Sequence, residues 1–202
     1  MTNTSEAILT IARDLVREGG PAALSFDAIA ARLGRSKQAV LYWYPSKHAL
    51  LAALYLPWLA AESAAVEEAL EGITDRERAI AVFVETVAGF HLADLERFRI
   101  VYLAPQMQAQ AARPPGGLMP EINATTARLY AALAARLGGP EARAEAMALH
   151  AAVLGLVLMV ALADGVGDPL KHATEVLVPR LAARLGGSVV GSGDTGGSAG
   201  RA

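Results

Sequence analysis

Hydrophobic residues recur every three or four positions through the first 50 residues, which predicts three short helices with one apolar face each. The first helix is expected over residues 7–18. The second follows Ser25, a residue type typical of helix N-caps, and ends at Gly34, which can adopt the left-handed conformation of a helix C-terminus. Ser36 is the expected cap of the third helix, and Pro45 ends it.

Longer helices are predicted beyond Ser46, the expected cap of a fourth helix that runs from Lys47 to about Glu71 with a kink at Pro57. Further helices are predicted over residues 74–91 (opened by a capping box at 74–77), 94–104, 121–137, 140–163 (opened by Pro140) and 168–185 (capped by Asp168). The pattern therefore indicates an all-α protein of about nine helices. We expect a helix-turn-helix domain at 1–46, a second helical domain at 47–185, and a Gly/Ser-rich tail at 186–202 that carries no fold.

The composition agrees with a folded helical protein. Of the 202 residues 53% are hydrophobic and 19% are charged, which excludes a disordered chain, and the many alanines favour helix over strand. The absence of cysteine excludes disulfides, thiolate metal sites and a cysteine nucleophile, and we expect a cytoplasmic protein. The uncharged run Ala146–Ala163 is barely long enough for a membrane span; it contains His150, and we favour a helix buried on all sides.

The third helix has two different faces, which is typical of the second helix of a helix-turn-helix unit. Val40, Leu41 and Tyr44 fall on one side, where they can pack against the first two helices. The other side holds Gln38, Ala39 and Tyr42, flanked by Arg35 and Trp43. These residues suit contacts with base edges and phosphates better than they suit a core, although any small helical unit exposes some aromatic side chains.

The stretch IAARLGRSKQAVLYWYPSK at residues 29–47, followed by Ala49-Leu50-Leu51, resembles the N-terminal domain of the TetR family of bacterial transcriptional regulators. The resemblance extends over Ile8–Tyr55. It implies groove contacts from Lys37, Gln38 and Tyr42 and phosphate contacts from Ser25 and Lys47. The full set of expected DNA-binding residues is Ser25, Arg35, Ser36, Lys37, Gln38, Ala39, Tyr42, Trp43 and Lys47.

The sequence departs from the family pattern at three positions of the motif. Arg35 stands where a small apolar residue is usual, Leu41 replaces a common tyrosine, and Trp43 replaces a common histidine. The DNA sequence recognised therefore cannot be borrowed from a relative.

The last two predicted helices carry long apolar faces that one chain cannot easily cover. The face residues are Leu149, Ala152, Val153 and Leu156 on one helix and Leu170, Leu177 and Leu181 on the other. A homodimer through these helices, which the resemblance also implies, would pair two recognition helices on one double-stranded DNA operator. The alternative is an internal core without a dimer.

Aromatic residues at helical spacing in the second domain fit either a core or a pocket for a small apolar or aromatic effector. The candidate lining residues are Phe83, Phe90, His91, Phe98, Tyr102 and His150. His91 and Asp94 could form half a metal site, but no other residue supports one, so no metal and no cofactor is expected.

These observations predict a sequence-specific DNA-binding regulator, a repressor that an effector releases from an inverted-repeat operator. A regulator of the same kind without a small-molecule effector, constitutive or controlled by a protein partner, is the alternative. No hydrolase, metalloprotease, P-loop or dinucleotide-binding motif occurs, so an enzyme is not expected.

Overall fold

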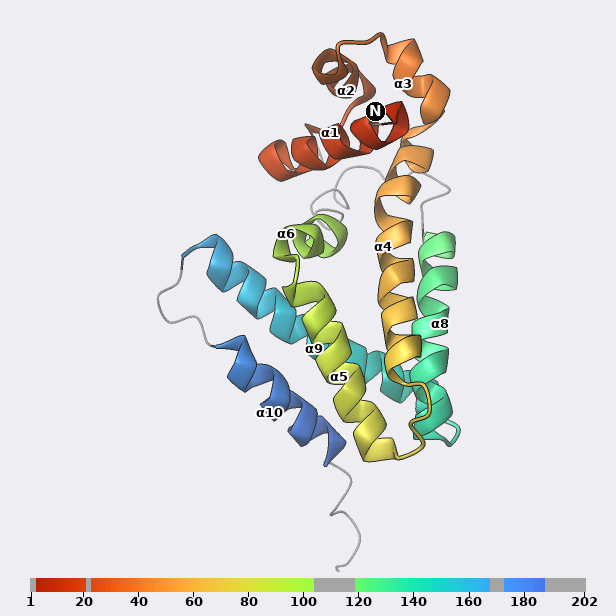
Figure 1. Ribbon diagram of the computed structural model, residues 1–202, viewed down its shortest axis with the longest axis vertical. Coiled ribbons are helices and arrows are strands. Elements are labelled where there is room, and N and C mark those ends of the chain that lie inside the picture. Colours follow the sequence, from red (N-terminus) through yellow and green to blue (C-terminus); the bar gives the residue numbers. More distant parts are fainter. Residues whose placement is uncertain (1–2, 21–22, 104–118, 168–172, 188–202) are drawn as a thin grey trace, which may run out of the picture.

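The computed structural model describes residues 3–20, 23–103, 119–167 and 173–187, and within these ranges it contains α-helices, one π-helical segment and no strand. The all-α prediction is confirmed. The α-helices are α1 (Thr4–Gly19), α2 (Phe26–Leu33), α3 (Lys37–Trp43), α4 (Lys47–Ala69), α5 (Arg76–Leu92), α6 (Leu95–Phe98), α8 (Met119–Leu137), α9 (Ala142–Gly165) and α10 (Thr174–Gly186), with the π-helical segment η2 (Arg99–Leu103) after α6. Figure 1 shows α1–α3 as a head at one end of α4, above a larger helical body.

Local capping signals determine the helix ends in the head. The Ser25 hydroxyl accepts a hydrogen bond from the backbone N–H of Ala28 at 3.1 Å, and Gly34 ends α2 in the left-handed region at φ 66°. The Ser36 hydroxyl caps α3 in the same way. The three short helices predicted from the sequence are therefore confirmed, together with both serine caps.

The head has a hydrophobic core of its own. Its fully buried members come from all three helices and from the start of α4: Ile8, Ala12, Ile29, Val40 and Leu50. The Ser5 and Tyr44 hydroxyls hydrogen-bond at 2.7 Å and join the beginning of α1 to the end of α3. The position of α3 is therefore determined by packing against α1 and α2.

The body is arranged around α5. Helices α4, α8, α9 and α10 all pack against it, and α10 contacts α5 much more extensively than it contacts α9 (Figure 1). The centre of this core is formed by large side chains with almost no exposed surface: Ile80, Phe83, Phe98, Leu129 and Leu133.

Helix α4 connects the head to the body without a break. Ser46 caps it as predicted, and Pro57 lies inside one continuous helix (Figure 1). By length and composition alone, α4 and α9 would each be long and apolar enough to cross a membrane. In the described part of the chain, both helices pack one side against other helices.

Several predicted boundaries shift. The cap of α5 is Asp75, whose carboxylate accepts from the Arg78 N–H at 2.7 Å, and not the preceding threonine of the expected capping box. Helix α9 begins at Ala142, with Pro140 in the turn before it, and α10 begins at Thr174. The predicted Asp168 cap, the Pro/Gly loop at 113–117 and the tail from residue 188 lie outside the described residues.

The expectation that α9 is buried on all sides is wrong for the single chain. One face, including Leu149 and Val153, packs in the core, so these two residues do not form the predicted dimer face. The opposite face exposes Met147, Met159 and Leu162, interspersed with small residues. The apolar residues of α9 therefore lie on two faces of the helix, and the described part of the chain covers only the core face.

Candidate functional site

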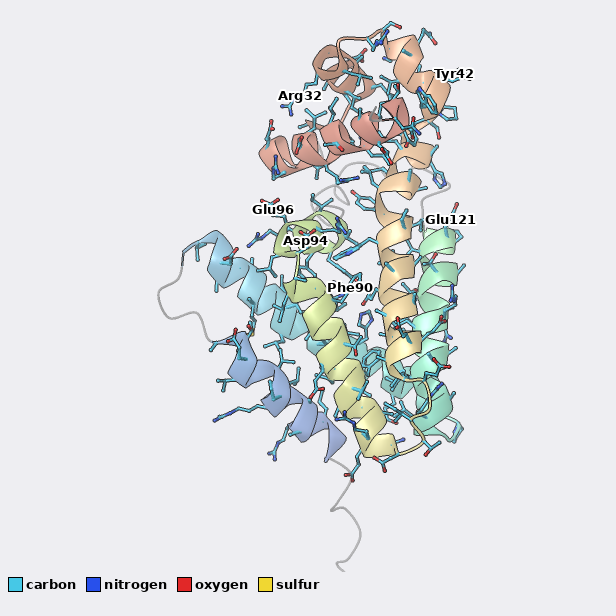
Figure 2. The ribbon with its side chains drawn as sticks, viewed as in Figure 1. Arg32, Tyr42, Phe90, Asp94, Glu96 and Glu121 are labelled. Atoms are coloured by element: carbon cyan, nitrogen blue, oxygen red, sulfur yellow. The ribbon has the colours of Figure 1, made fainter. Side chains whose placement is uncertain are left out.

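Helix α3 presents a polar and aromatic surface to solvent. Val40 and Tyr44 are buried, Leu41 is half-buried, and the Tyr42 side chain is 81% exposed. Figure 2 shows Tyr42 on the outer side of the head, remote from Phe90 and Asp94 in the body. The division of α3 into a packing face and a free face agrees with the sequence prediction.

The other residues expected at the DNA are also accessible, with one exception. Ser25, Arg35, Ser36, Lys37, Gln38, Trp43 and Lys47 are exposed, and Ala39 is half-buried. The Trp43 ring lies edge-to-face against Tyr42 with ring centroids 5.6 Å apart. This contact stiffens two aromatic side chains at the exposed end of α3.

Three of these residues meet at one hollow in the surface of the head. A cavity of about 280 Å³ is lined by Ser25, Lys37 and Lys47, together with Asp27 and the apolar side chains of Leu24, Phe26 and Leu50. It adjoins the N-terminus of α2, where backbone N–H groups and the helix dipole favour an anion. The hollow therefore has two cations and a helix N-terminus available for a phosphate group.

Asp27 is a neighbour of this hollow that the sequence reasoning missed. Its carboxylate is 2.9 Å from Lys37 Nζ, and both side chains are at least half exposed. The position of Asp27, ten residues before Lys37 in the preceding helix, gives no sequence signal for this pairing. In the described structure Lys37 is thus held by an acid that a DNA phosphate would have to replace.

The body contains a second polar site, which is deeply buried. Glu62 of α4, His91 of α5 and His150 of α9 are 1%, 0% and 3% exposed. Glu62 Oε1 is 3.0 Å from Nε2 of each histidine. The Tyr102 hydroxyl donates to Glu62 Oε2 at 3.2 Å, and the Tyr130 hydroxyl is 3.0 Å from His150 Nδ1.

These contacts determine the ionisation of the cluster. Burial raises the pKa of Glu62, but hydrogen bonds and charge interactions with His150 and His91 outweigh it and lower this pKa to about 2. Burial, followed by the Glu62 charge, raises the pKa of the Tyr102 hydroxyl, which therefore remains a donor. Glu62 is a buried carboxylate that stays ionised at neutral pH.

All six predicted effector residues lie in or beside this cluster. His91 is ringed by Phe90, Phe98 and Tyr102 at centroid distances of 5.3–5.4 Å, and Phe83 lies 6.1 Å from His150. Asp94 does not join them, because it caps α6 through the Arg97 N–H, so the suggested His91–Asp94 pair does not form. Sequence reasoning missed Glu62, although it is the only acid between Lys47 and Glu67 in an otherwise apolar stretch.

A larger cavity of about 540 Å³ lies between the head and the body. It is bounded by α1, α4 and the α6–η2 segment, and none of the six predicted effector residues lines it. Its apolar wall consists of Leu9, Leu54, Trp58, Ile100 and Val101, among other residues. Trp58 also stacks on Phe90 with centroids 5.3 Å apart, so the cavity and the aromatic cluster share a side chain.

Charged groups from both parts surround this cavity. Arg17 of α1 is 3.6 Å from Glu96 of α6, an ion pair that joins head and body. Arg97 lies 5.7 Å from the centre of the Trp58 ring. Figure 2 shows Asp94, the cap of α6, and Glu96 of α6 directly below the head. The cavity therefore offers charged as well as apolar side chains to a ligand.

Comparison with known proteins identifies the arrangement. Residues 8–54 match the sequence model of the bacterial regulatory proteins of the tetR family, which places α1–α3 and the start of α4 in that DNA-binding domain. The head is a DNA-binding domain of the TetR family. A search of curated proteins finds no match to the chain.

Solved structures of other TetR-like regulators share the whole fold. A transcriptional regulator from Rhodococcus sp. Rha1 superposes with a TM-score of 0.66 at 26% identity, over 91% of this chain and 95% of that chain. The TetR-family regulator PfmR from Thermus thermophilus has a TM-score of 0.63 at 22% identity, over 92% and 96%. FadR from Bacillus subtilis, solved with stearoyl-CoA, has a TM-score of 0.67 at 15% identity, over 91% and 98%. The last two are similar in fold only.

A head of this family implies regulation through DNA binding, and the three structures named above are described as transcriptional regulators. The TetR-family head is the part of the molecule that carries this function. Which DNA is bound, and what controls the binding, depends on residues specific to this chain.

Proposed function

We propose that this TetR-family protein is a homodimeric repressor that binds an inverted-repeat operator and is released by a small-molecule effector. In this proposal residues 1–46 form the DNA-binding domain, residues 47–185 bind the effector and form the dimer, and the protein acts in the cytoplasm, where its operator lies. The observation that carries the proposal is the exposed face of α3, held in place by the separate core of the head.

Sequence reading is assigned to Gln38 and Tyr42, with Arg35, Ala39 and Trp43 beside them. A glutamine can form paired hydrogen bonds with adenine in the major groove, and an aromatic ring can contact a thymine methyl group. Both assigned side chains are exposed on the same helix, free of the contacts that hold Val40 and Tyr44. We therefore expect α3 to enter the major groove.

Phosphate binding is assigned to the hollow at the N-terminus of α2. Lys47 and the hydroxyl of Ser25 line it, and Ser36 lies exposed at the N-terminus of α3. Lys37, which the resemblance assigns to the groove, also lines the hollow and is reassigned here to phosphate. Each serine oxygen accepts the capping N–H of its own helix, so its O–H proton is available to donate to a phosphate oxygen. These contacts would position α3 without reading the base sequence.

The dimer is assigned to the outer face of α9 together with α10. Met159 is 66% exposed, and Met147, Leu162 and Val176 are also large exposed apolar side chains. Small residues between them, such as Ala151 and Gly155, allow close approach of a second helix. A two-fold axis here would pair two heads, and half-sites about 34–36 Å apart would fit one face of the DNA.

The effector is assigned to the cavity between head and body. Its volume of about 540 Å³ falls in the range of small-molecule sites, which is about 300–1,000 Å³. A ligand with an apolar or aromatic body could contact Trp58 and, through it, the predicted cluster around Phe90 and His91. Because α1 and α6 form opposite walls, a ligand that favours one separation of these walls would change the tilt of the head.

Selection of genomic DNA fragments by the purified protein tests the DNA part of the proposal. At about 150 mM salt, where non-specific binding is weak, we expect an enriched inverted repeat bound by two chains. The Tyr42→Ala variant, whose substitution is on the surface, should enrich the same sequence much less. Enrichment of the same repeat by this variant would exclude α3 as the reading element.

A fluorescent probe tests the effector part. The chain has two tryptophans, so the Trp43→Phe variant retains only Trp58 as an energy donor. We expect anilinonaphthalene sulfonate, an aromatic probe, to bind this variant and receive energy from Trp58. Absence of binding by this probe would favour the alternative regulator, which is constitutive or controlled by a protein partner.

A further inference from the structure

The buried polar cluster of the body joins three helices that are distant in sequence. Glu62, His91 and His150 contribute one carboxylate oxygen and two imidazole nitrogens, and these three atoms lie within 4.8 Å of one another. Each Nε2 is 3.0 Å from the same oxygen, Glu62 Oε1. All three residues are at least 97% buried.

Two of the three distances between these atoms are close to those between metal ligands. Around a tetrahedral Zn²⁺ with bonds of about 2.0–2.1 Å, neighbouring ligand atoms are about 3.3 Å apart. The two nitrogen–oxygen distances of 3.0 Å would need to lengthen by only a few tenths of an ångström. The two imidazole nitrogens, which lie within 4.8 Å of each other, would have to approach by up to about 1.5 Å.

Two side chains that hydrogen-bond to the cluster are placed like the groups that orient metal ligands. A histidine that binds a metal through one ring nitrogen usually forms a hydrogen bond through the other, which orients the ring. His150 Nδ1 has this bond with the Tyr130 hydroxyl, and the second oxygen of Glu62 accepts from Tyr102. Two of the three groups are therefore oriented by tyrosines.

The described protein groups pair the polar atoms of the cluster incompletely. Among the described residues no lysine or arginine pairs with the Glu62 carboxylate, and its ion-pair partners are the two histidines, which carry a charge only when protonated. Within the described part of the chain His91 Nδ1 is buried and has no hydrogen-bond partner, so His91, unlike His150, has no second group that orients its ring. A divalent ion bound through the two Nε2 atoms would place positive charge beside the Glu62 carboxylate, and it would leave His91 Nδ1 unpaired.

We propose that Glu62, His91 and His150 bind one divalent transition-metal ion, Zn²⁺ in preference to Mg²⁺ or Ca²⁺, between α4, α5 and α9. Two imidazoles with a single carboxylate suit Zn²⁺, while Mg²⁺ and Ca²⁺ require mainly oxygen ligands. The ion ties α4, the helix that carries the head, to the centre of the body. This site goes beyond the proposed function, because binding of the ion requires neither operator nor effector.

Metal binding by the full chain, free of any affinity tag and stripped with a chelator, tests the proposal. We expect one Zn²⁺ per chain by equilibrium dialysis, and a Co²⁺ complex with the strong visible absorption of a tetrahedral site that Zn²⁺ abolishes. His91→Gln and His150→Gln should each weaken Zn²⁺ binding at least about 100-fold, and Tyr130→Phe about 10-fold. His48→Gln is the matched control, because His48 is an exposed histidine of α4 that pairs with Glu121.

Nitrogen NMR of the unmodified chain keeps the test decisive if the histidine variants fail to fold. Of the four histidines, two should change their Nε2 resonances on addition of one equivalent of Zn²⁺, and His48, assigned through its variant, should not. Failure of the wild-type chain to bind Zn²⁺ stoichiometrically would overturn the proposal. Loss of binding in the His48 variant, with retention in the two buried-histidine variants, would also overturn it. Neither result affects the test by DNA selection.

Discussion

The ion pair between Asp27 and Lys37 leads to a prediction about operator affinity, in which loss of a surface charge increases the affinity. Removing an acid from the head, in Asp27→Asn, should strengthen DNA binding while slightly weakening the fold. Asp27 lies in the first turn of α2, where a negative charge stabilises the helix dipole by about 0.3–1 kcal/mol. Because the variant also loses the ion pair with Lys37, it should be less stable by about 0.5–2 kcal/mol in urea unfolding.

The gain in affinity follows from the geometry of the pair. Lys37 Nζ is 2.9 Å from Asp27, and the side chains are 50% and 73% exposed. An exposed pair of this kind is worth about 0.2–1 kcal/mol, which a phosphate must replace when it binds Lys37. With two heads on one operator the gain is about 0.4–2 kcal/mol, or about 2- to 30-fold in Kd.

Fluorescence anisotropy with the selected operator at several salt concentrations measures this change. Glu67→Gln is the matched control, because it removes the same charge from a comparable pair with Arg128 in the body and should leave operator Kd unchanged. The Lys37→Ala background separates release of the lysine from a general charge effect. If Asp27→Asn improves binding equally in that background, Lys37 is not at the phosphate and the assignment of the hollow is wrong.

Three further predictions concern the reading helix, the dimer and the backbone. Tyr42→Ala should weaken operator binding by about 1–3 kcal/mol without changing the unfolding midpoint, and a lowered midpoint would mean that the ring also serves the fold. Met159→Glu should halve the mass in sedimentation, whereas Ala64→Glu on the exposed side of α4 should not; an unchanged mass for both would place the dimer elsewhere. Gly34→Ala should destabilise the protein by about 1–2 kcal/mol, because this residue is left-handed at φ 66°, while Gly89→Ala within α5 should stabilise it by about 0.5–1 kcal/mol in the same urea titration.

The sequence by itself determined most of the head. Ser25, Gly34, Ser36 and Ser46 act on the backbone of their own helices within three or four residues, so their roles can be read locally. The apolar spacing around Val40 determined which face of α3 is free, because a short amphipathic helix has only one face to bury. The family motif lies entirely within this locally determined region.

Only the tertiary structure decided the features of the body. In α9 the apolar residues surround the helix, so periodicity could not separate Val153, which is buried, from Met159, which is exposed. His91 and His150 lie 29 and 88 residues after Glu62, and the meeting of the three depends on how α4, α5 and α9 pack. Local capping and amphipathicity act over a few residues of one helix, whereas a buried polar cluster exists only where side chains of several helices share one volume.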